Sequence, residues 1–333
     1  MKERLAGWWE VENNNIRCVL CPEKCLIYEG KTGLCKVRKN IDNKLYSLVY
    51  GKPIAMNIDP IEKKPLYHFL PGTNVFSIGT YGCNMQCKFC QNWDISQKNI
   101  QKIEYEIEYY SPEQIVDLAI KNSCDSIAFT YNEPTIFGEY VLDIAKLARR
   151  ENLKTVMVTN GYIMPKARNE IYKYIDSANI DVKGFTENFY KSFTGASLKN
   201  VLNTILYLKK ENIHIELTTL LIDGKNDNEF DLRNEFNWIS ENLGNDIPLH
   251  LSAFYPAYKM LDENRTRIKS LKKAKQIAKE SHLNYVYIGN IAGVDNNTYC
   301  DNCGEIIINR SGLSTKIIQK NRCKCGKEIK IIT

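Results

Sequence analysis

The residues with the clearest capacity for chemistry are cysteines, and three of them form a tight group. Cys83, Cys87 and Cys90 make a C-x3-C-x2-C triplet shortly after the apolar run VFSIGT. A [4Fe–4S] cluster usually takes four cysteine ligands, so a triplet would leave one iron open for a small molecule. Gly79 and Gly82 flank the entry to the triplet and would let the backbone fold tightly around a bound group. The alternatives are a zinc site completed by a distant residue, and three buried thiols without metal.

Two further cysteine sets flank this triplet. The C-terminal set consists of Cys300, Cys303, Cys323 and Cys325. It resembles a zinc ribbon or rubredoxin-like module, in which two cysteine pairs present four thiolates to one tetrahedral ion, although its C-x-C half is one residue short. The N-terminal set consists of Cys18, Cys21, Cys25 and Cys35. It predicts either a zinc site or a second iron–sulfur cluster, with free thiols or a redox pair as the alternatives.

The composition is that of an ordinary globular protein, with 333 residues, 44% hydrophobic and 25% charged. The net charge is +6 with both signs interspersed, so neither a nucleic acid nor a membrane is a required partner. No apolar run reaches the roughly 18 residues of a membrane span. The N-terminus has no apolar signal core, and we therefore expect a cytoplasmic protein. In a reducing compartment clustered cysteines more often hold metal, whereas the isolated Cys124 is expected to be a buried core thiol.

Strand-length and helix-length patterns alternate along residues 75–289. Apolar runs such as VFSIGT, DSIAFT and KTVMVT predict strands, and amphipathic stretches such as SPEQIVDLAIKN and EYVLDIAKLARRE predict the helices between them. The alternation predicts an α/β fold with a full or partial (β/α) TIM-type barrel, and a doubly wound open sheet is the alternative. We expect three parts: a cysteine-containing segment over 1–74, the barrel over 75–289, and a four-cysteine metal-binding tail over 290–333.

The triplet, placed after the first barrel strand, resembles the hallmark loop of the radical S-adenosylmethionine (SAM) enzymes. The resemblance implies that Cys83, Cys87 and Cys90 ligate three irons of a [4Fe–4S] cluster, while the amine and carboxylate of SAM chelate the fourth. It implies that Phe89 lies against the adenine. It also implies that an electron from a ferredoxin- or flavodoxin-type donor cleaves SAM to a 5′-deoxyadenosyl radical, which abstracts a substrate hydrogen.

The loops after the second and third strands fit the same family. Where the family carries a GGE-type motif for the SAM amine, this chain has Asn132, Glu133 and a following proline. Only the glutamate and the proline match, and a carboxylate facing an ammonium group is a strong charge-assisted contact. Asn160 lies in a Thr-Asn-Gly sequence that resembles an element of glycyl-radical-enzyme activases. The resemblance implies that these residues help to hold SAM.

The later strands supply the remaining candidates. Asp181 and Lys183 end the fourth strand on one face, and by themselves they would form an ordinary ion pair. They resemble the D-x-K element with which the activases hold SAM, and the resemblance gives them that role here. The activases also carry a late histidine, for which Tyr255 is the favoured counterpart and His250, otherwise a core histidine, is the alternative.

Four longer stretches narrow the resemblance: CPEKCLI…GLCKVRKN, NIDPIEKKPLYHFLPGT, SIGTYGCNMQCKFCQNWDISQ and YIGN…TYCDNCG. Together they are similar to the radical SAM enzyme of the AmmeMemoRadiSam system, which is like the pyruvate formate-lyase activating enzyme. This resemblance implies AMMECR-type and Memo-type partner proteins and names no substrate. Within DPIEKKPLYHF, five side chains are expected either on the substrate side of the barrel or in a solvated turn: Glu62, Lys63, Lys64, Tyr67 and His68.

The sequence therefore predicts an enzyme that cleaves SAM reductively and abstracts hydrogen within this three-component system. The substrate would be a small molecule, an RNA or a protein residue. One alternative is a glycyl-radical-enzyme activase. An alternative of another class is a non-catalytic binding protein in which zinc stabilises all three cysteine groups.

Overall fold

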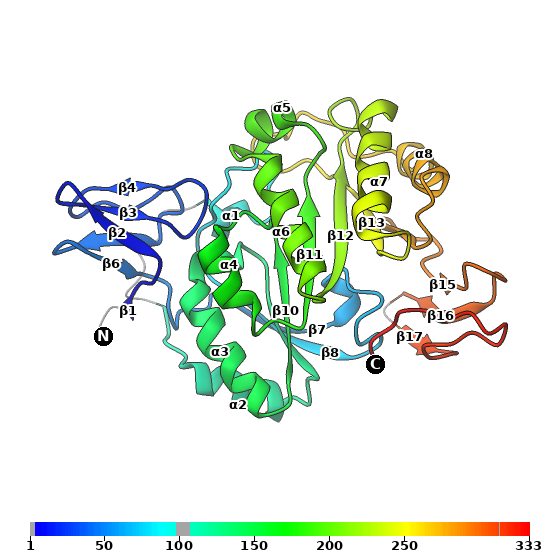
Figure 1. The fold of residues 1–333 in the computed structure, drawn as a ribbon, viewed down its shortest axis with the longest axis horizontal. Coiled ribbons are helices and arrows are strands. Elements are labelled where there is room, and N and C mark those ends of the chain that lie inside the picture. The colour runs from blue at the N-terminus through cyan, green and yellow to red at the C-terminus, as the bar shows by residue number, and fades with distance from the viewer. Residues whose placement is uncertain (1–3, 98–106, 313) are drawn as a thin grey trace.

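The computed structural model describes residues 4–97, 107–312 and 314–333. One large β-sheet forms the central part of the protein (Figure 1). The eight strands of this sheet are β7 (Ala55–Pro60), β8 (Asn74–Gly79), β9 (Ser126–Phe129), β10 (Lys154–Thr159), β11 (Ser177–Val182), β12 (His214–Leu221), β13 (Leu249–Ala253) and β14 (Val286–Gly289). They stand in sequential order, and every neighbouring pair is parallel except β7 with β8.

This strand order decides between the two expected architectures. A doubly wound sheet reverses its strand order at a switch point, and this sheet has no reversal. The α/β barrel-type expectation is therefore confirmed. Among the described residues β14 and β7 are the two ends of the sheet and do not pair with each other, so the barrel is partial. The predicted boundaries at residues 75 and 290 stay a prediction, and the sheet itself begins earlier, at β7.

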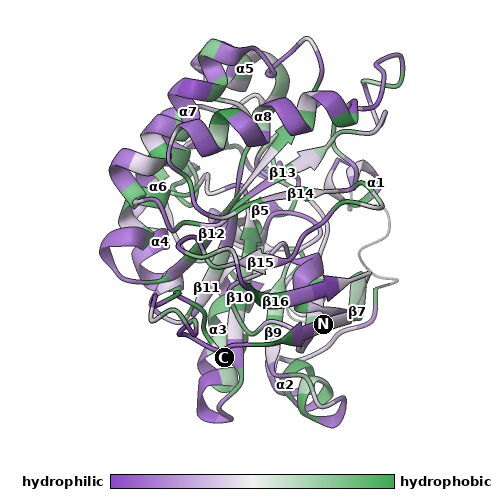
Figure 2. Ribbon diagram, turned by 90° about the vertical axis from the view of Figure 1, so that its right-hand side faces the viewer, coloured by the Kyte–Doolittle hydropathy of each residue, from purple (hydrophilic) through white to green (hydrophobic). Residues whose placement is uncertain are grey.

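Helices cover the outer face of the sheet (Figure 1). They are α1 (Trp93–Ser96), α2 (Pro112–Lys121), α3 (Gly138–Arg150), α4 (Pro165–Tyr172), α5 (Glu187–Phe189), α6 (Leu198–Lys210), α7 (Glu229–Leu243) and α8 (Ile268–Glu280), with short η1 (Ile61–Lys63), η3 (Pro134–Phe137) and η4 (Tyr190–Thr194) turns. Hydrophilic segments dominate the exposed helices α7 and α8 in Figure 2. Their apolar residues face the sheet and build the core.

Helix α2 shows how local sequence sets these elements. The Ser111 hydroxyl accepts a hydrogen bond from the Gln114 amide, and the Gln114 side chain accepts one from the Ser111 amide. Pro112 fills the first helical position, where no N–H donor is needed. Ile115 and Val116 then lie on the buried face. The helix predicted from SPEQIVDLAIKN is confirmed.

Two small sheets precede the barrel and form an N-terminal module at its left edge in Figure 1. Their strands are β2 (Trp9–Glu12), β3 (Asn15–Cys18) and β4 (Leu26–Ile27) in one sheet, and β1 (Arg4–Leu5), β6 (Lys44–Ser47) and β5 (Arg38–Ile41) in the other. Arg38, which is 1% exposed, binds Glu139 of α3 at 2.8 and 3.1 Å. This buried ion pair fastens the module to the barrel.

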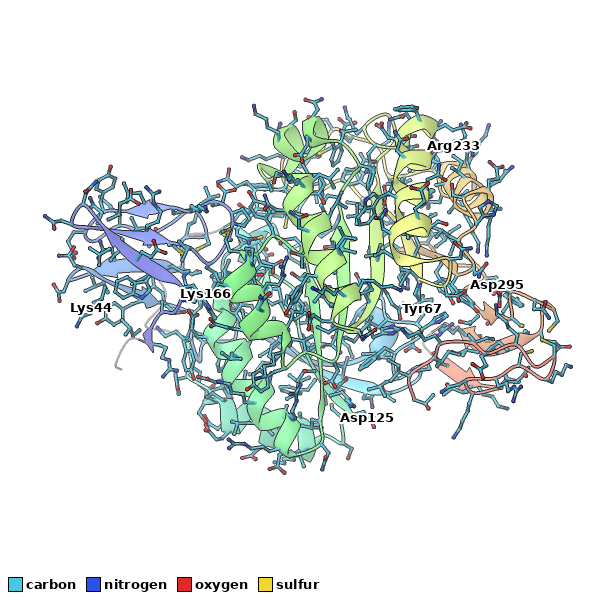
Figure 3. All side chains as sticks on the ribbon, viewed as in Figure 1. Lys44, Tyr67, Asp125, Lys166, Arg233 and Asp295 are labelled. Atoms are coloured by element: carbon cyan, nitrogen blue, oxygen red, sulfur yellow. The ribbon has the colours of Figure 1, made fainter. Side chains whose placement is uncertain are left out.

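A third small sheet follows the barrel, with antiparallel strands β15 (Thr298–Tyr299), β16 (Ile306–Ser311) and β17 (Ser314–Ile317). Arg310 donates to the Tyr67 carbonyl at 2.6 Å, and the His68 ring bonds the Tyr287 hydroxyl at 2.7 Å and the Lys330 carbonyl at 3.2 Å. Figure 3 places Tyr67 between the barrel sheet and these strands. The tail is therefore anchored to the barrel through side chains of both.

The segment between β7 and β8 fills the inside of the partial barrel at the amino ends of its strands. Leu66 and Phe69 pack against the inner faces of β8, β9 and β10. Asn179 of β11 donates to the Pro65 carbonyl at 2.7 Å, and Glu216 of β12 accepts from the backbone of the same segment. We call residues 65–70 the plug. No helix within the described parts of the chain has the length and apolar character needed to cross a bilayer.

Candidate functional site

A cleft of about 340 Å³ opens at the carboxyl ends of the barrel strands, at the other end from the plug. The structure brings nine of the predicted site residues together on its walls: Cys83, Cys87, Phe89, Cys90, Asn132, Glu133, Asn160, Asp181 and Lys183. They come from the loops after β8, β9 and β10 and from the end of β11. The loops after parallel strands carry the chemistry in barrel enzymes, so this cleft is the candidate active site.

The cysteine loop is braced by side-chain amides from the neighbouring strands. Asn132 accepts from the Thr80 amide at 3.0 Å and donates to the Gly82 carbonyl at 2.8 Å. Asn160 places its side-chain nitrogen 3.9 Å from the Cys83 sulfur, which also accepts from the Met85 amide at 3.4 Å. Donors of this kind favour the thiolate over the thiol.

Burial has the opposite effect, because it favours the neutral thiol form of the three cysteines over the thiolate. It raises the pKa of Cys83, Cys87 and Cys90, and for Cys87 the pKa rises to about 12. The Lys183 ammonium lowers the pKa of Cys87 and Cys90 in part. Metal binding requires deprotonated thiols, so these residues hold their protons until a metal displaces them.

The spacing of the three sulfurs distinguishes between kinds of metal centre. Within the described ranges, only the C-terminal set brings three or more ligand atoms to within 4.8 Å of one another. Cys83, Cys87 and Cys90 are therefore spread more widely than the ligands of one tetrahedral ion. Three thiols spread around an open cleft fit a cluster of several irons.

Glu133 is 3% exposed and lies at the base of the cleft wall. Its Oε1 accepts from the Thr135 amide at 2.9 Å and the Thr159 hydroxyl at 2.8 Å, and its Oε2 accepts from the Asn160 amide at 2.8 Å. Burial raises the pKa of this carboxyl, and the three donors lower it in part. The donors fix the orientation of the carboxylate.

Asp181 and Lys183 form an ion pair at 2.6 Å beside the cysteine loop. Burial lowers the pKa of Lys183, but the charges of Asp181 and Cys87 outweigh it, so the pKa is raised overall. The lysine therefore stays charged next to the Cys87 sulfur. Both side chains line the cleft, as their spacing on one strand face predicted.

Phe89 lines the cleft as well, is 3% exposed, and packs its ring 6.2 Å from that of Phe189. The Tyr255 hydroxyl donates to the Asn290 carbonyl at 2.8 Å, and Tyr255 is not among the cleft-lining residues, so its predicted role gains no support. Ser252 of β13 lines the cleft instead. Sequence reasoning missed Ser252, although its two-residue spacing from His250 places both on the inner face of β13.

Two lysines from the segment between β7 and β8 also line the cleft. Lys64 is 3% exposed and donates to Asp59 at 2.7 Å, and the Tyr131 hydroxyl donates to the same carboxylate at 2.8 Å. Burial raises the pKa of Asp59, but these two partners lower it to about 2. Lys63 and Lys64 line the cleft, and their role on a substrate side of the barrel stays a prediction. Glu62 instead accepts from the Gly72 amide at 2.9 Å, away from the cleft.

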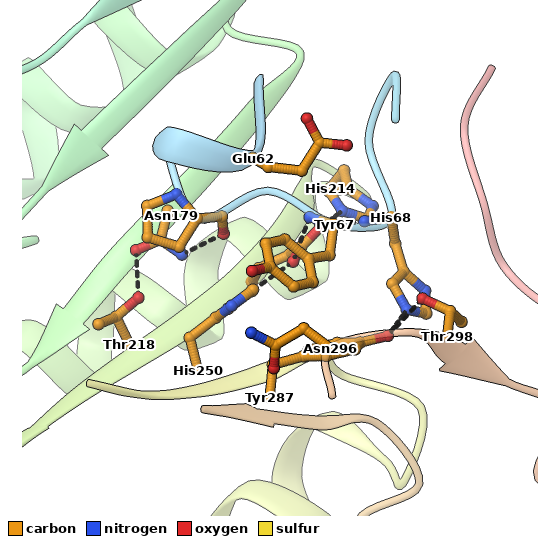
Figure 4. Close-up of polar contacts among 12 residues, drawn as sticks. Glu62, Tyr67, His68, Asn179, His214, Thr218, His250, Tyr287, Asn296 and Thr298 are labelled. Atoms are coloured by element: carbon orange, nitrogen blue, oxygen red, sulfur yellow. Dashed lines mark hydrogen bonds and ion pairs between the residues drawn. The ribbon is translucent and has the colours of Figure 1, made fainter. Parts of the chain in front are cut away.

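The expectation for Tyr67 and His68 was also wrong, because both belong to the plug. Their backbone amides donate to Glu216 at 2.9 and 2.7 Å, and His214 and His250 bond the same carboxylate at 3.1 and 2.7 Å. Figure 4 shows the labelled rings of this network gathered between the strands and the tail. Glu216 is fully buried, so His250 is a core histidine that holds the barrel together rather than a cleft residue.

The C-terminal set is the most compact of the three cysteine groups. The Cys300 and Cys325 sulfurs lie 3.7 Å apart, and those of Cys303 and Cys323 lie 3.5 Å apart. Zn–S bonds of about 2.3 Å in a tetrahedron place the sulfurs about 3.8 Å apart. The shortened C-x-C half is thus compatible with a mononuclear site. Cys124 is 4% exposed, as expected for a core thiol.

Comparison with known proteins gives matches to the barrel and to the whole chain. A family model described as the radical SAM superfamily matches residues 77–234. An uncharacterized protein of Methanocaldococcus jannaschii is 43% identical over 99% of each chain. A protein of the same species named as a glycyl-radical enzyme activating enzyme is 28% identical over 60% of this chain and 74% of its own.

More distant matches extend the comparison. The pyruvate formate-lyase 1-activating enzyme of Escherichia coli K12 is 22% identical over 52% of this chain and 71% of its own. Among solved structures, Streptococcus suis SuiB bound to precursor peptide SuiA superposes with a TM-score of 0.51 and 12% identity, covering 70% of this chain and 52% of that one. This last similarity shows a shared fold alone.

Proposed function

The chain belongs to the radical SAM superfamily, and from that premise we propose that the cleft above β8–β13 holds a [4Fe–4S] cluster and SAM. Membership implies both groups, and it favours an enzyme over the non-catalytic, zinc-stabilised alternative. The observation that carries the proposal is the convergence of three spread cysteines with Glu133, Asp181 and Lys183 on one cleft. The bound cluster supplies the electron that cleaves SAM, and a flavodoxin- or ferredoxin-type protein delivers it.

In this proposal the chain prepares the cluster site in two ways. Cys83, Cys87 and Cys90 would hold the cluster through their three thiolates, which would leave one open position for SAM. Asn160 and the Met85 amide hydrogen-bond the Cys83 sulfur, and Lys183 offsets negative charge beside Cys87. Hydrogen bonds and nearby charge to the ligating sulfurs tune such a centre.

The same walls orient SAM. Glu133, held in place by its three donors, accepts the SAM ammonium in a charge-assisted contact. Asp181 and Lys183 offer one charge of each sign to the polar end of SAM, and Phe89 packs against its adenine. Asn132 acts indirectly, because its amide braces the cysteine loop through Thr80 and Gly82.

The proposal for the substrate names the protein system that handles it and not the molecule itself. We propose that this enzyme abstracts hydrogen from a substrate handled together with AMMECR-type and Memo-type proteins, as the sequence resemblance implies. The likeness to activating enzymes favours a second candidate, a glycyl-radical-enzyme activase. A glycyl-radical EPR doublet on a partner protein would identify the chain as an activase. If no doublet forms and another substrate is consumed, the first proposal would be supported.

The C-terminal set is proposed to bind one zinc ion, which the sulfur separations of 3.7 and 3.5 Å support. Zinc would order the tail without taking part in the reaction, because a site with four thiolate ligands has no open position.

The test uses anaerobically purified and reconstituted protein treated with dithionite and SAM. We expect 5′-deoxyadenosine from the native chain and none when Cys83, Cys87 and Cys90 are replaced together by Ala. Cys124→Ser is the matched control, because this thiol lies outside every cysteine set, and it should keep both iron and activity. Reductive SAM cleavage by the triple variant would refute the proposal.

A further inference from the structure

The four cysteines of the N-terminal set surround a hollow of their own. Cys18 ends β3, Cys21 and Cys25 lie in the loop before β4, and Cys35 precedes β5. All four line one small, partly enclosed cavity of about 10 Å³. Three of them are buried and Cys25 is partly buried. Four thiols on a common hollow are a donor set without an assigned ligand.

Backbone amides are arranged around these sulfurs as they are around the cysteine loop of the cleft. The Leu34 amide donates to the Cys25 sulfur at 3.4 Å. The backbone of Glu23 and that of Val37, each two residues further along the chain, lower the pKa of Cys21 and Cys35 in part, although burial raises it overall. The Met85 amide stands in the same relation to Cys83. Amide donors to sulfur stabilise metal-bound thiolates.

A buried cation lies beside the same hollow. Arg38 is 1% exposed and lines the cavity together with Cys18 and Cys35. Its two terminal nitrogens bind Glu139 and the Gly7 carbonyl, but its Nε–H has no hydrogen-bond partner. A buried donor without a partner is costly, and an anionic thiolate centre in this cavity would satisfy it.

The sulfur spacing separates this set from the C-terminal one. The C-terminal sulfurs lie at the separations of a single tetrahedral ion, whereas no three ligand atoms of the N-terminal set fall within 4.8 Å of one another. A cluster of several irons spreads its thiolates more widely than one ion does, because the metal–metal separation adds to the metal–sulfur bonds. We infer that Cys18, Cys21, Cys25 and Cys35 ligate an iron–sulfur cluster, in addition to the cluster proposed for the cleft.

This second centre adjoins the cysteine loop of the cleft. Asn84, which follows Cys83, lines the N-terminal hollow and donates to the Tyr162 carbonyl at 2.7 Å. A Cβ atom on Gly82 would lie 2.5 Å from the Cys35 carbonyl oxygen. The loops that carry the two cysteine groups are therefore in direct contact at Gly82 and Cys35.

The experiment removes the cleft cluster and asks what iron remains. The full chain carrying Cys83→Ala, Cys87→Ala and Cys90→Ala is reconstituted anaerobically with iron and sulfide, and its iron, sulfide and zinc are measured per chain. We expect about two or four irons with matching sulfide, a Mössbauer spectrum of an iron–sulfur cluster, and about one zinc. Iron-free protein, whether it holds a second zinc or no further metal, would overturn the inference.

Further substitutions in this background locate the iron. Adding Cys18→Ser and Cys35→Ser should remove the iron and leave the zinc, whereas adding Cys300→Ser and Cys303→Ser should remove the zinc and leave the iron. If the iron remains bound after Cys18→Ser and Cys35→Ser but is lost after Cys300→Ser and Cys303→Ser, the inference would also be overturned. The first measurement leaves the N-terminal set intact, so it does not depend on whether its variants fold.

The outcome is independent of the proposed reaction. Native protein that forms 5′-deoxyadenosine while the triple variant binds no iron would leave the proposed function standing and remove this inference. Iron in the triple variant, together with native protein that cleaves no SAM, would do the reverse.

Discussion

Gly82 joins the cysteine loop to the N-terminal module, and an alanine there tests how tightly the two are packed. Gly82 has φ +89°, and an added Cβ would meet the Cys35 carbonyl oxygen at 2.5 Å and the Val37 side chain at 2.8 Å. Gly224 provides a matched control, because it has φ +74° and no atom within 4 Å of the same added Cβ. Both substitutions strain the backbone, but only Gly82→Ala also creates a clash.

The two costs can be separated. A left-handed backbone conformation costs an alanine roughly 1–2 kcal/mol, which both variants bear. Overfilling a packed site costs about 1–3 kcal/mol more, which falls on Gly82→Ala alone because a backbone oxygen is in the way. At roughly 2 °C per kcal/mol for a large chain, the melting temperatures of the two variants should differ by about 2–6 °C.

Thermal unfolding of the two variants at one scan rate measures this difference, and iron analysis measures its consequence. The clash pushes Cys83 away from Cys35, so Gly82→Ala should bind less iron after anaerobic reconstitution, whereas Gly224→Ala should bind as much as the native chain. Equal melting temperatures and full iron binding in both variants would refute the packing argument.

Three further predictions concern buried charges. Arg38→Met leaves Glu139 unpaired and should lower the free energy of unfolding by about 3–5 kcal/mol, measured by denaturant titration. Burial lowers the pKa of His68 to about 4, below its unfolded value of about 6.5, so its contribution to stability is complete above pH 6.5 and is lost as the pH falls toward 4. That loss is about 2 kcal/mol between pH 7 and pH 5, and His68→Phe should remove it from the stability profile. Glu133→Gln should weaken SAM binding about 10- to 100-fold in equilibrium dialysis while iron content stays unchanged.

Each of these has a result that would contradict it. Arg4→Met removes an exposed ion pair with Asp143 and should change the free energy of unfolding little. If Arg38→Met changed the free energy of unfolding no more than Arg4→Met does, burial would not explain the strength of the Arg38–Glu139 pair. A His68→Phe variant that loses stability with acid as steeply as the native chain would place the titration elsewhere. Loss of iron from Glu133→Gln would mean that this carboxylate holds the loop together rather than the ligand.

What the sequence predicted well depended on local spacing. The cysteine triplet, the Ser111 cap of α2 and the alternation of strands and helices all act over a few residues, and the structure placed the triplet and the predicted carboxylates on one cleft. Helix α7 was harder to predict from the sequence because two of its residues break the amphipathic pattern. Phe230 is 74% exposed, while Glu235 is 1% exposed, accepts from the Thr219 hydroxyl and has its pKa raised by burial to about 8.

What the sequence could not predict depended on contacts between distant segments. Glu216 accepts from the backbone of Tyr67, 149 residues earlier, so no local pattern could show that the segment around Tyr67 and His68 enters the barrel. The same carboxylate holds His250 and removes it from the cleft. Likewise, the spread of the N-terminal sulfurs and the compactness of the C-terminal ones follow from how each module closes, which the spacing of the cysteines along the chain does not show.

The plug also limits the routes by which ligands can reach the cleft. Residues 65–70 fill the amino end of the barrel and are bound there by Glu216, Asn179 and the C-terminal strands. Because the plug closes the amino end along the barrel axis, a cofactor and a substrate would approach the cleft from the carboxyl ends of the strands, where its lining residues lie. The two would then share one side of the barrel, so the bound cofactor would form part of the surface that the substrate meets.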